Sequence, residues 1–163
     1  MKSLRWFPIT ACLLAFGLIY FRPASYAQGT NVLHYTPAAP ARAKIGGTVE
    51  VSVPLSLQEG YHVNSNHPSD EYLIPLKLTW SKGALEPAET VYPKPTLHKV
   101  QSEPKPLSVY SGNFELIAKF NVPATAVTGP VGMNGKLKYQ ACNDKMCLAP
   151  KDLDVNVQLD IVK

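Results

Sequence analysis

Two cysteines near the C-terminus, Cys142 and Cys147, are the residues of this sequence best suited to chemistry. Four residues separate them, so the two thiols can meet across a tight loop and close a disulfide in an oxidising compartment. So small a ring stabilises a fold by only about 2 kcal/mol, because it closes a short loop of the unfolded chain. An accessible disulfide in a turn is also readily reduced. Spacing alone leaves a redox centre, a structural disulfide and a metal site open.

A soft-metal module is the first rival interpretation. Cys142, Met146 and Cys147, joined by Met133 or a histidine, would offer the thiolates and thioethers that Cu(I) prefers. The direct adjacency of Met146 and Cys147 weakens this hypothesis, because the methionine can instead point into the core. A structural interaction domain with an inert disulfide is the second rival.

The first 27 residues are predicted to be a cleaved secretory signal peptide, which leaves a mature domain of residues 28–163. Lys2 and Arg5 precede an apolar run, and small residues close the segment at Ala27. The run is shorter than the roughly 20 residues of a membrane span, and no later stretch approaches that length. We therefore expect a periplasmic domain that does not span the membrane.

Cys12 lies inside the apolar run. Ile9-Thr-Ala-Cys12 resembles a lipoprotein cleavage box, but cleavage there would leave most of the apolar residues on the mature protein. We therefore interpret Cys12 as a small apolar residue of the signal peptide.

Charge and size limit the possible functions. Removal of the signal peptide takes away three of the 16 basic residues and none of the 12 acidic ones, so the formal charge falls from +4 to +1. This balance gives no reason to expect nucleic acid as a partner. The remaining 163 − 27 = 136 residues can bury roughly two thirds of their unfolded surface, so the fold does not need a disulfide.

Apolar and polar residues alternate along two long segments. From Thr48 to Leu57 and from Leu153 to Ile161 every second residue is apolar, which is the pattern of half-buried strands. Weaker strand patterns cover residues 31–36, 74–80, 85–92, 114–120 and 131–140. No helical period is found. Many short strands separated by prolines and turns predict an all-β, immunoglobulin-like antiparallel β-sandwich.

Proline placement adds detail to this prediction. Pro54 within the first long strand predicts a sheet edge or a bulge. The Pro/Ala-rich stretch up to Ala43 is expected to be a connector, and Pro93–Pro106 a long loop. The cysteines are expected on a hairpin-like tip between the last two strands.

The residues around the cysteines resemble a known family. Tyr139-Gln-Ala-Cys142 and Cys147-Leu-Ala-Pro150 are similar to the cysteine motif of the N-terminal periplasmic domain of DsbD-type thiol:disulfide interchange proteins. Further similar motifs follow in the same order as in that family: Gly60-Tyr-His-Val-Asn-Ser-Asn66, Asp70-Glu-Tyr-Leu-Ile-Pro75, Tyr92-Pro-Lys-Pro95 and Pro106-Leu-Ser-Val-Tyr-Ser-Gly112. The resemblance covers roughly Val32 to Val162.

The resemblance implies an immunoglobulin-like domain that exchanges electrons with thioredoxin-fold periplasmic proteins or a membrane electron donor, without a cofactor or metal. It implies a protein-disulfide reductase-like role in which Cys147 forms the mixed disulfide with a partner and Cys142 resolves it. Lys145 would favour a thiolate there and Asp144 would oppose it. The family's transmembrane and thioredoxin-like domains are not in the sequence, so this chain is not expected to carry electrons across a membrane by itself.

Seven further residues are predicted to surround the cysteines: Tyr61, His62, Asp70, Glu71, Tyr110, Tyr139 and Met146. Residue type leaves alternatives for several of them. Tyr61 and Tyr139 are equally well explained as core aromatics, Asp70-Glu71 as a solvated loop pair, and His62 as a polar loop residue.

The resemblance also implies a cap that covers the cysteines until a partner displaces it. In this sequence the cap would be the loop from Leu97 to Tyr110, with Leu97, Val100 and Leu107 as its bulky apolar residues. Better-known family members place an aromatic side chain over the disulfide, so we expect looser shielding here.

Overall fold

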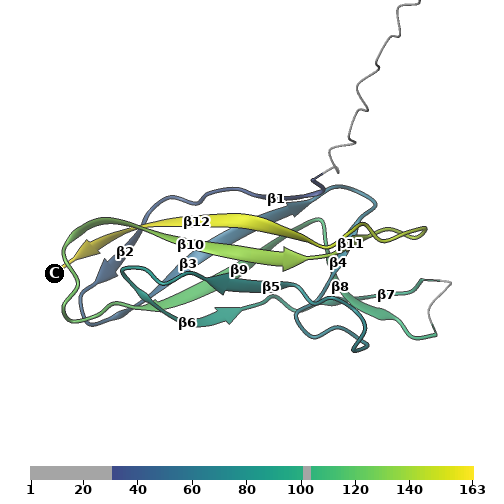
Figure 1. Cartoon of the computed structure of the whole chain (residues 1–163), viewed down its shortest axis with the longest axis horizontal. Helices are drawn as coiled ribbons and strands as arrows, with labels where there is room; N and C mark the ends of the chain where they lie inside the picture. Colours follow the sequence, from purple (N-terminus) through teal and green to yellow (C-terminus); the bar gives the residue numbers. More distant parts are fainter. Residues whose placement is uncertain (1–30, 101–103) are drawn as a thin grey trace, which may run out of the picture.

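The computed structural model of the chain describes residues 31–100 and 104–163. The predicted signal peptide, residues 1–27, and its Cys12 lie outside the described residues. Within them the chain forms twelve strands and no helix, and so no helix that could cross a membrane (Figure 1). The strands are β1 Leu33–Tyr35, β2 Ala41–Lys44, β3 Thr48–Leu57, β4 His62–Asn64, β5 Lys77–Trp80, β6 Glu86–Val91, β7 Thr96–His98, β8 Leu107–Ser111, β9 Asn113–Asn121, β10 Gly129–Tyr139, β11 Ala141–Cys142 and β12 Lys151–Val162.

Two four-stranded sheets form an immunoglobulin-like sandwich, as the sequence predicts. One sheet has the strand order β1-β3-β9-β6 and the other β2-β12-β10-β5. The long alternating segments are their central strands, because each offers one fully apolar face to the core. The inward side chains of β3 are all buried, and so are four of the six of β12: Val49, Val51, Val53, Leu55 and Leu57, then Val155, Val157, Leu159 and Ile161.

Two predictions about prolines and connectors are wrong. Pro54 marks neither an edge nor a bulge, because β3 lies between β1 and β9 and keeps its register with β9 through Pro54. The Pro54 carbonyl accepts a hydrogen bond from the Thr36 amide, which lies just beyond the end of β1. Proline has no N–H to donate, and at this position no residue of β1 remains to accept one. The expected connector before Ala43 contains β2, which pairs in parallel with β12.

A third, smaller sheet with the order β11-β4-β8-β7 lies at one end of the sandwich (right in Figure 1). It is built from continuations of the main strands. β11 follows β10 after Gln140, β8 leads into β9 through Gly112, and β7 follows β6. Because β6 pairs with β9, their continuations β7 and β8 also pair. The small sheet therefore connects the two main sheets at the cysteine end.

The long loop predicted over Pro93–Pro106 is interrupted by β7, and the predicted cap from Leu97 to Tyr110 overlaps both β7 and β8. Thr96 pairs with Val109 and His98 with Leu107. Sequence patterns fail here because β7 has three residues and β8 five, and prolines flank both strands.

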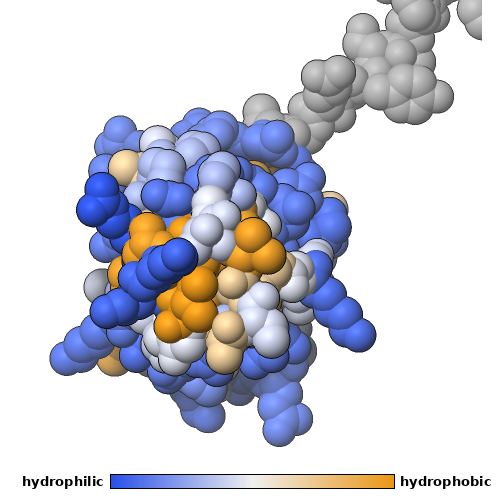
Figure 2. All heavy atoms as spheres, turned by 90° about the vertical axis from the view of Figure 1, so that its left-hand side faces the viewer, coloured by the Kyte–Doolittle hydropathy of each residue, from blue (hydrophilic) through white to orange (hydrophobic). Residues whose placement is uncertain are grey.

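The opposite end of the sandwich is apolar at its centre and hydrophilic around it (Figure 2). Val127, in the loop between β9 and β10 at this end, is 81% exposed. The cysteines lie at the other end, so this apolar surface takes no part in their chemistry.

Gly112 joins β8 to β9 with a φ of +63°, a left-handed conformation that L side chains adopt at a cost of about 1–2 kcal/mol. Its carbonyl also accepts a hydrogen bond from the Leu57 amide at 2.9 Å. The sharp change of direction between the main sheet and the small sheet therefore depends on glycine.

We expect Gly112→Ala to lower the free energy of unfolding by about 1–2 kcal/mol, because the alanine must adopt the left-handed conformation. Chemical denaturation of the oxidised protein measures this change. Gly132→Ala, in β10, is the matched control: an added Cβ there meets the flexible end of Gln158 at 3.3 Å. An equal effect of both substitutions would contradict the assignment of strain to Gly112.

Candidate active site

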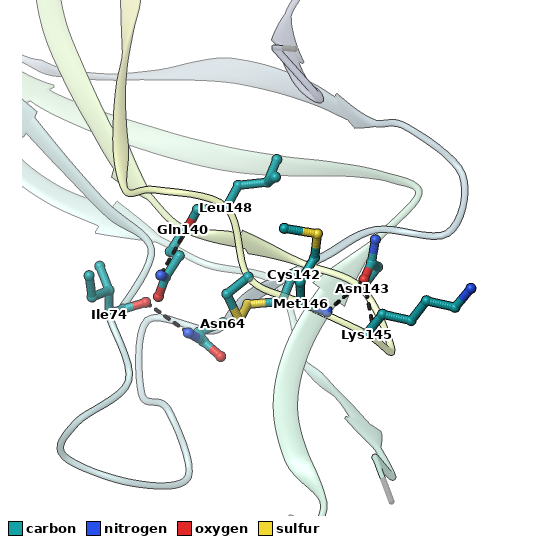
Figure 3. Close-up of a disulfide and its surroundings, with 9 residues drawn as sticks. Asn64, Ile74, Gln140, Cys142, Asn143, Lys145, Met146 and Leu148 are labelled. Atoms are coloured by element: carbon teal, nitrogen blue, oxygen red, sulfur yellow. Dashed lines mark hydrogen bonds between the residues drawn. A yellow bond between two sulfur atoms is a disulfide. The ribbon is translucent and has the colours of Figure 1, made fainter. Parts of the chain in front are cut away.

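The cysteine segment is a tight β-hairpin. Asn143 donates its amide to the Met146 carbonyl at 2.9 Å, and Leu148 donates its amide to the Ala141 carbonyl at 2.8 Å. These two bonds flank Cys142 and Cys147, which face each other as a non-hydrogen-bonded pair. Such pairs bring side chains closest together, and the two Cα atoms lie 4.0 Å apart. The cysteines form a disulfide (Figure 3).

Side-chain amides hold both ends of this hairpin. Asn143 Oδ1 accepts hydrogen bonds from the amides of Lys145 and Met146, each at 2.9 Å, which fixes the turn. At the base, Gln140 Nε2 donates to the Leu148 carbonyl at 3.0 Å (Figure 3). These hydrogen bonds fix the backbone of the hairpin, and the backbone in turn holds the two sulfur atoms opposite each other.

The two cysteines differ in exposure. Cys142 is 6% exposed because β11 pairs with β4, where His62 is its direct cross-strand neighbour. Cys147 lies on the outer arm of the hairpin and is exposed. A thiol from another molecule can therefore approach Cys147 but not Cys142.

The disulfide borders a pocket of about 130 Å³, which we call the cysteine pocket. Small-molecule sites usually enclose about 300–1,000 Å³, so this pocket does not suit a small-molecule substrate. Its residues come from β4, the loop after β4, the segment after β7, the start of β8, and the hairpin: His62, Asn64, Leu73, Val100, Leu107, Cys142, Asn143, Asp144, Lys145, Met146 and Cys147.

Two histidines and a carboxylate form a cluster beside the disulfide. His62 is 5% exposed, and its ring centroid lies 4.8 Å from that of His98 on β7. His98 Nε2 is in turn 3.1 Å from Asp144 Oδ1, at the tip of the hairpin. Burial lowers the pKa of His62, His98 lowers it further, and Asp144 raises it. Nε2 of His62 is buried and has no hydrogen-bond partner among the described residues.

Two of the three predicted cap residues lie at the cysteine pocket, and the third does not. Val100 and Leu107 line the cysteine pocket, whereas Leu97 is 76% exposed and does not line it. Leu73, from the loop between β4 and β5, lines the pocket as well. The apolar cover therefore comes from two loops, of which the sequence analysis considered one.

None of the three predicted tyrosines lines the cysteine pocket. Tyr110 and Tyr139 are each 3% exposed and belong to the core, and Tyr61 packs against it half-buried. The Tyr110 hydroxyl donates to Asn66 Oδ1 at 2.7 Å. Burial raises the pKa of both Tyr110 and Tyr139, so their hydroxyls stay protonated. The positions of Tyr61 and Tyr139 correspond to the core alternative that residue type left open, whereas no core alternative was considered for Tyr110.

The other predicted neighbours lie in loops. Asp70 and Glu71 do not line the cysteine pocket, although the Asp70 carbonyl accepts a hydrogen bond from the Leu73 amide at 3.2 Å. Met146 is 58% exposed, and its side chain leaves the hairpin away from the disulfide (Figure 3).

Four residues near the disulfide were missed by the sequence analysis: Asn64, Leu73, His98 and Asn143. Asn64 follows His62 by two residues, so period-2 alternation along β4 could have identified it; its Nδ2 donates to the Ile74 carbonyl at 3.0 Å. His98 gave no signal in the sequence, because only the β7–β8 pairing brings it to the hairpin. Among the described residues, no group of three or more His, Cys, Asp or Glu side chains is arranged to hold a metal ion.

Fold and site together define an immunoglobulin-like domain with an accessible disulfide at one end of its sandwich. The family model for "Thiol:disulfide interchange protein DsbD, N-terminal" matches residues 30–159, and the chain belongs to this family. It is a family of periplasmic domains, and membership implies thiol–disulfide exchange as the chemistry of the site. A comparison with curated protein sequences finds no match.

A comparison with solved structures finds several similar chains, of which the ScsB domain supports this fold. The N-terminal periplasmic domain of ScsB from Proteus mirabilis has a TM-score of 0.51 and 16% identity, over 71% of this chain and 42% of that chain. The reduced N-terminal domain of DsbD from Neisseria meningitidis has a TM-score of 0.42 and 18% identity, over 67% of this chain and 76% of that chain. A type I cohesin from Pseudobacteroides cellulosolvens has a TM-score of 0.44 and 17% identity, over 80% of this chain and 92% of that chain. This chain thus spans less than half of the ScsB chain, and the ScsB likeness concerns the fold alone.

We expect Asn143→Ala to make the disulfide easier to reduce. The substitution removes two hydrogen bonds that hold the sulfur atoms opposite each other, at a cost of about 1–2 kcal/mol. For a two-electron couple this raises the reduction potential by about 20–40 mV. Equilibration with a dithiothreitol couple measures the shift. Asn121→Ala, at the far end of β9, is the control, and a potential equal to wild type in both variants would show that the turn does not tune the disulfide.

The pKa of His62 predicts a pH dependence of stability. Because its pKa is lowered in the folded state, the unfolded chain binds the proton more readily, so stability rises with pH in this range. The contribution of neutral His62 to the free energy of unfolding is complete above about pH 6.5 and is lost as the pH falls below this value. We expect denaturation of His62→Gln to show a weaker loss on acidification than wild type. His67→Gln, three residues beyond β4 and exposed, should follow the wild-type curve.

Proposed function

We propose that the mature domain, residues 28–163, exchanges electrons with thioredoxin-fold proteins through the Cys142–Cys147 pair. The observation that carries this proposal is the asymmetry of the disulfide, with Cys147 exposed and Cys142 buried against β4. In thiol–disulfide exchange one sulfur must meet the partner and the other must stay within reach of the first. Cys147 suits the first role and Cys142 the second.

The reaction moves two electrons between the two proteins. A partner thiolate attacks Cys147, forms a mixed disulfide, and displaces Cys142 as a thiolate. The second partner thiolate then attacks the partner's own sulfur in that bond, which releases Cys147 and leaves this domain reduced and the partner oxidised. The reverse sequence oxidises this domain. The geometry of the hairpin serves both directions equally.

Exposed apolar side chains near the disulfide support a protein partner. Tyr72 is 68% exposed, Leu97 76% and Met146 58%. These residues belong to the three segments that meet at the cysteine pocket: the loop after β4, β7, and the hairpin. A pocket too small for a small-molecule substrate, with apolar side chains around it, suits a macromolecular partner that covers this end of the sandwich.

The proposed location is the periplasm, which a cleaved signal peptide over residues 1–27 would explain. An oxidising compartment with its own thiol-exchange proteins is where such a disulfide forms and persists. The Cu(I) alternative has less support, since Met146 leaves the hairpin away from the disulfide. The inert-disulfide alternative has less support as well, because the bond joins residues five apart and connects no distant strands.

The test is a trapping experiment with purified proteins. Reduced Cys142→Ser is mixed with a thioredoxin-fold protein whose second active-site cysteine is replaced by serine and whose remaining cysteine carries a thionitrobenzoate leaving group, so that the partner cannot release the adduct either. Mass spectrometry under non-reducing conditions detects the mixed disulfide. We expect a stable one-to-one adduct through Cys147, because the serine cannot resolve it. Cys147→Ser is the matched control and should give at most a slow reaction, since its remaining thiol is buried. Equal adduct from both variants, or adduct from neither, would contradict the assigned roles.

A further inference from the structure

We propose that His62 accepts and returns the proton of Cys142 during thiol–disulfide exchange. This inference rests on the proposed function and adds a proton-transferring residue to it. His62 and Cys142 are direct cross-strand neighbours on β4 and β11, and both side chains line the cysteine pocket. Side chains of directly opposed residues in an antiparallel pair lie about 4.5–5.5 Å apart at Cβ, which is within reach of an imidazole.

A buried resolving thiol such as Cys142 needs a proton acceptor close to it. Only the thiolate attacks a disulfide, and burial in apolar surroundings disfavours the thiolate. Cys142 is 6% exposed and has Leu73, Val100 and Leu107 around the same pocket. Water therefore has little access to the Cys142 proton, and a proton acceptor inside the pocket removes this obstacle.

His62 is suited to this task by its surroundings. Its Nε2 is buried and unpartnered among the described residues, so a nitrogen is available to bind a proton. Burial lowers the pKa of His62, which keeps the imidazole neutral and able to accept. Once protonated, it is stabilised by the new Cys142 thiolate and by Asp144, whose charge raises the pKa of His62.

Charged groups around His62 come from two directions. His98 faces it from β7 and disfavours its protonation, but His98 Nε2 lies 3.1 Å from Asp144 Oδ1. Asp144 and Lys145 reach the pocket from the hairpin. Apart from the cysteines, no other titratable side chain of the described residues lines the pocket.

The complete step balances as follows. With a disulfide partner attached to Cys147, the Cys142 thiol gives its proton to His62, and the resulting thiolate attacks Sγ of Cys147. The Cys142–Cys147 bond forms, the mixed disulfide breaks, and the partner leaves as a thiolate that takes up a proton. Two electrons pass from the two cysteines to the partner. In the reverse direction the protonated His62 returns the proton to Cys142 as it leaves.

The experiment uses oxidised glutathione as the probe and the reduced mature protein. Acid-quenched mass spectrometry follows two rates: formation of the Cys147–glutathione adduct, and its loss as the Cys142–Cys147 disulfide closes. We expect His62→Gln and His62→Asn to leave formation unchanged and to slow closure by about 100-fold, the low end of what a positioned proton acceptor contributes. His67→Gln is the control, because its side chain is exposed and does not line the pocket. A cooperative unfolding transition in chemical denaturation shows that the variants are folded.

A second readout separates proton transfer from a packing role. In Cys147→Ser, the ultraviolet absorbance of the thiolate reports the titration of Cys142. We expect a higher midpoint when His62→Gln is added, because the imidazole no longer interacts with the Cys142 thiolate. Equal midpoints, or equal closure rates with and without His62, would overturn the inference.

Different results would contradict the two proposals. If Cys142→Ser traps no mixed disulfide, the exchange function itself fails. If it traps one and the His62 variants close the disulfide at the wild-type rate, only the role of His62 fails.

Discussion

The pairing of β11 with β4 is the contact on which the site depends. It places Cys142 against His62 inside the small sheet, and it leaves the returning arm of the hairpin, with Cys147, on the outside. One strand pairing thus gives the disulfide a buried and an exposed sulfur. The same pairing opposes Cys142 to a histidine whose Nε2 is buried without a partner among the described residues. Accessibility and proton chemistry therefore have one structural origin.

The sandwich supports this arrangement without needing the disulfide for its own stability. Its core consists of apolar side chains from both main sheets, and the cysteine ring connects none of these strands to another. The small sheet is held in place because its strands continue β6, β9 and β10 beyond the main sheets. Opening and closing of the disulfide can therefore occur in the hairpin while the frame stays packed. A disulfide that must be broken in every reaction cycle suits such a position.

Sequence patterns predicted the parts of the structure that are decided locally. The alternation in Thr48–Leu57 and Leu153–Ile161 identified the central strands, and the cysteine spacing identified the hairpin. Strands β2, β4, β7, β8 and β11 were missed because they are short and owe their existence to partners far along the chain. His98 was missed for the same reason. Its approach to His62 depends on the order of four strands in the small sheet, which no single segment encodes.

The central claim is that the Cys142–Cys147 bond is a reaction centre and not a staple. A redox titration of the purified mature domain against a glutathione couple, with the thiol state read by mass spectrometry, tests it most directly. An exchange-active disulfide is expected to open within the range of periplasmic and glutathione-linked thiol proteins, roughly −120 to −270 mV. A bond that stays closed at poises below about −300 mV would behave as a structural disulfide and would contradict the account.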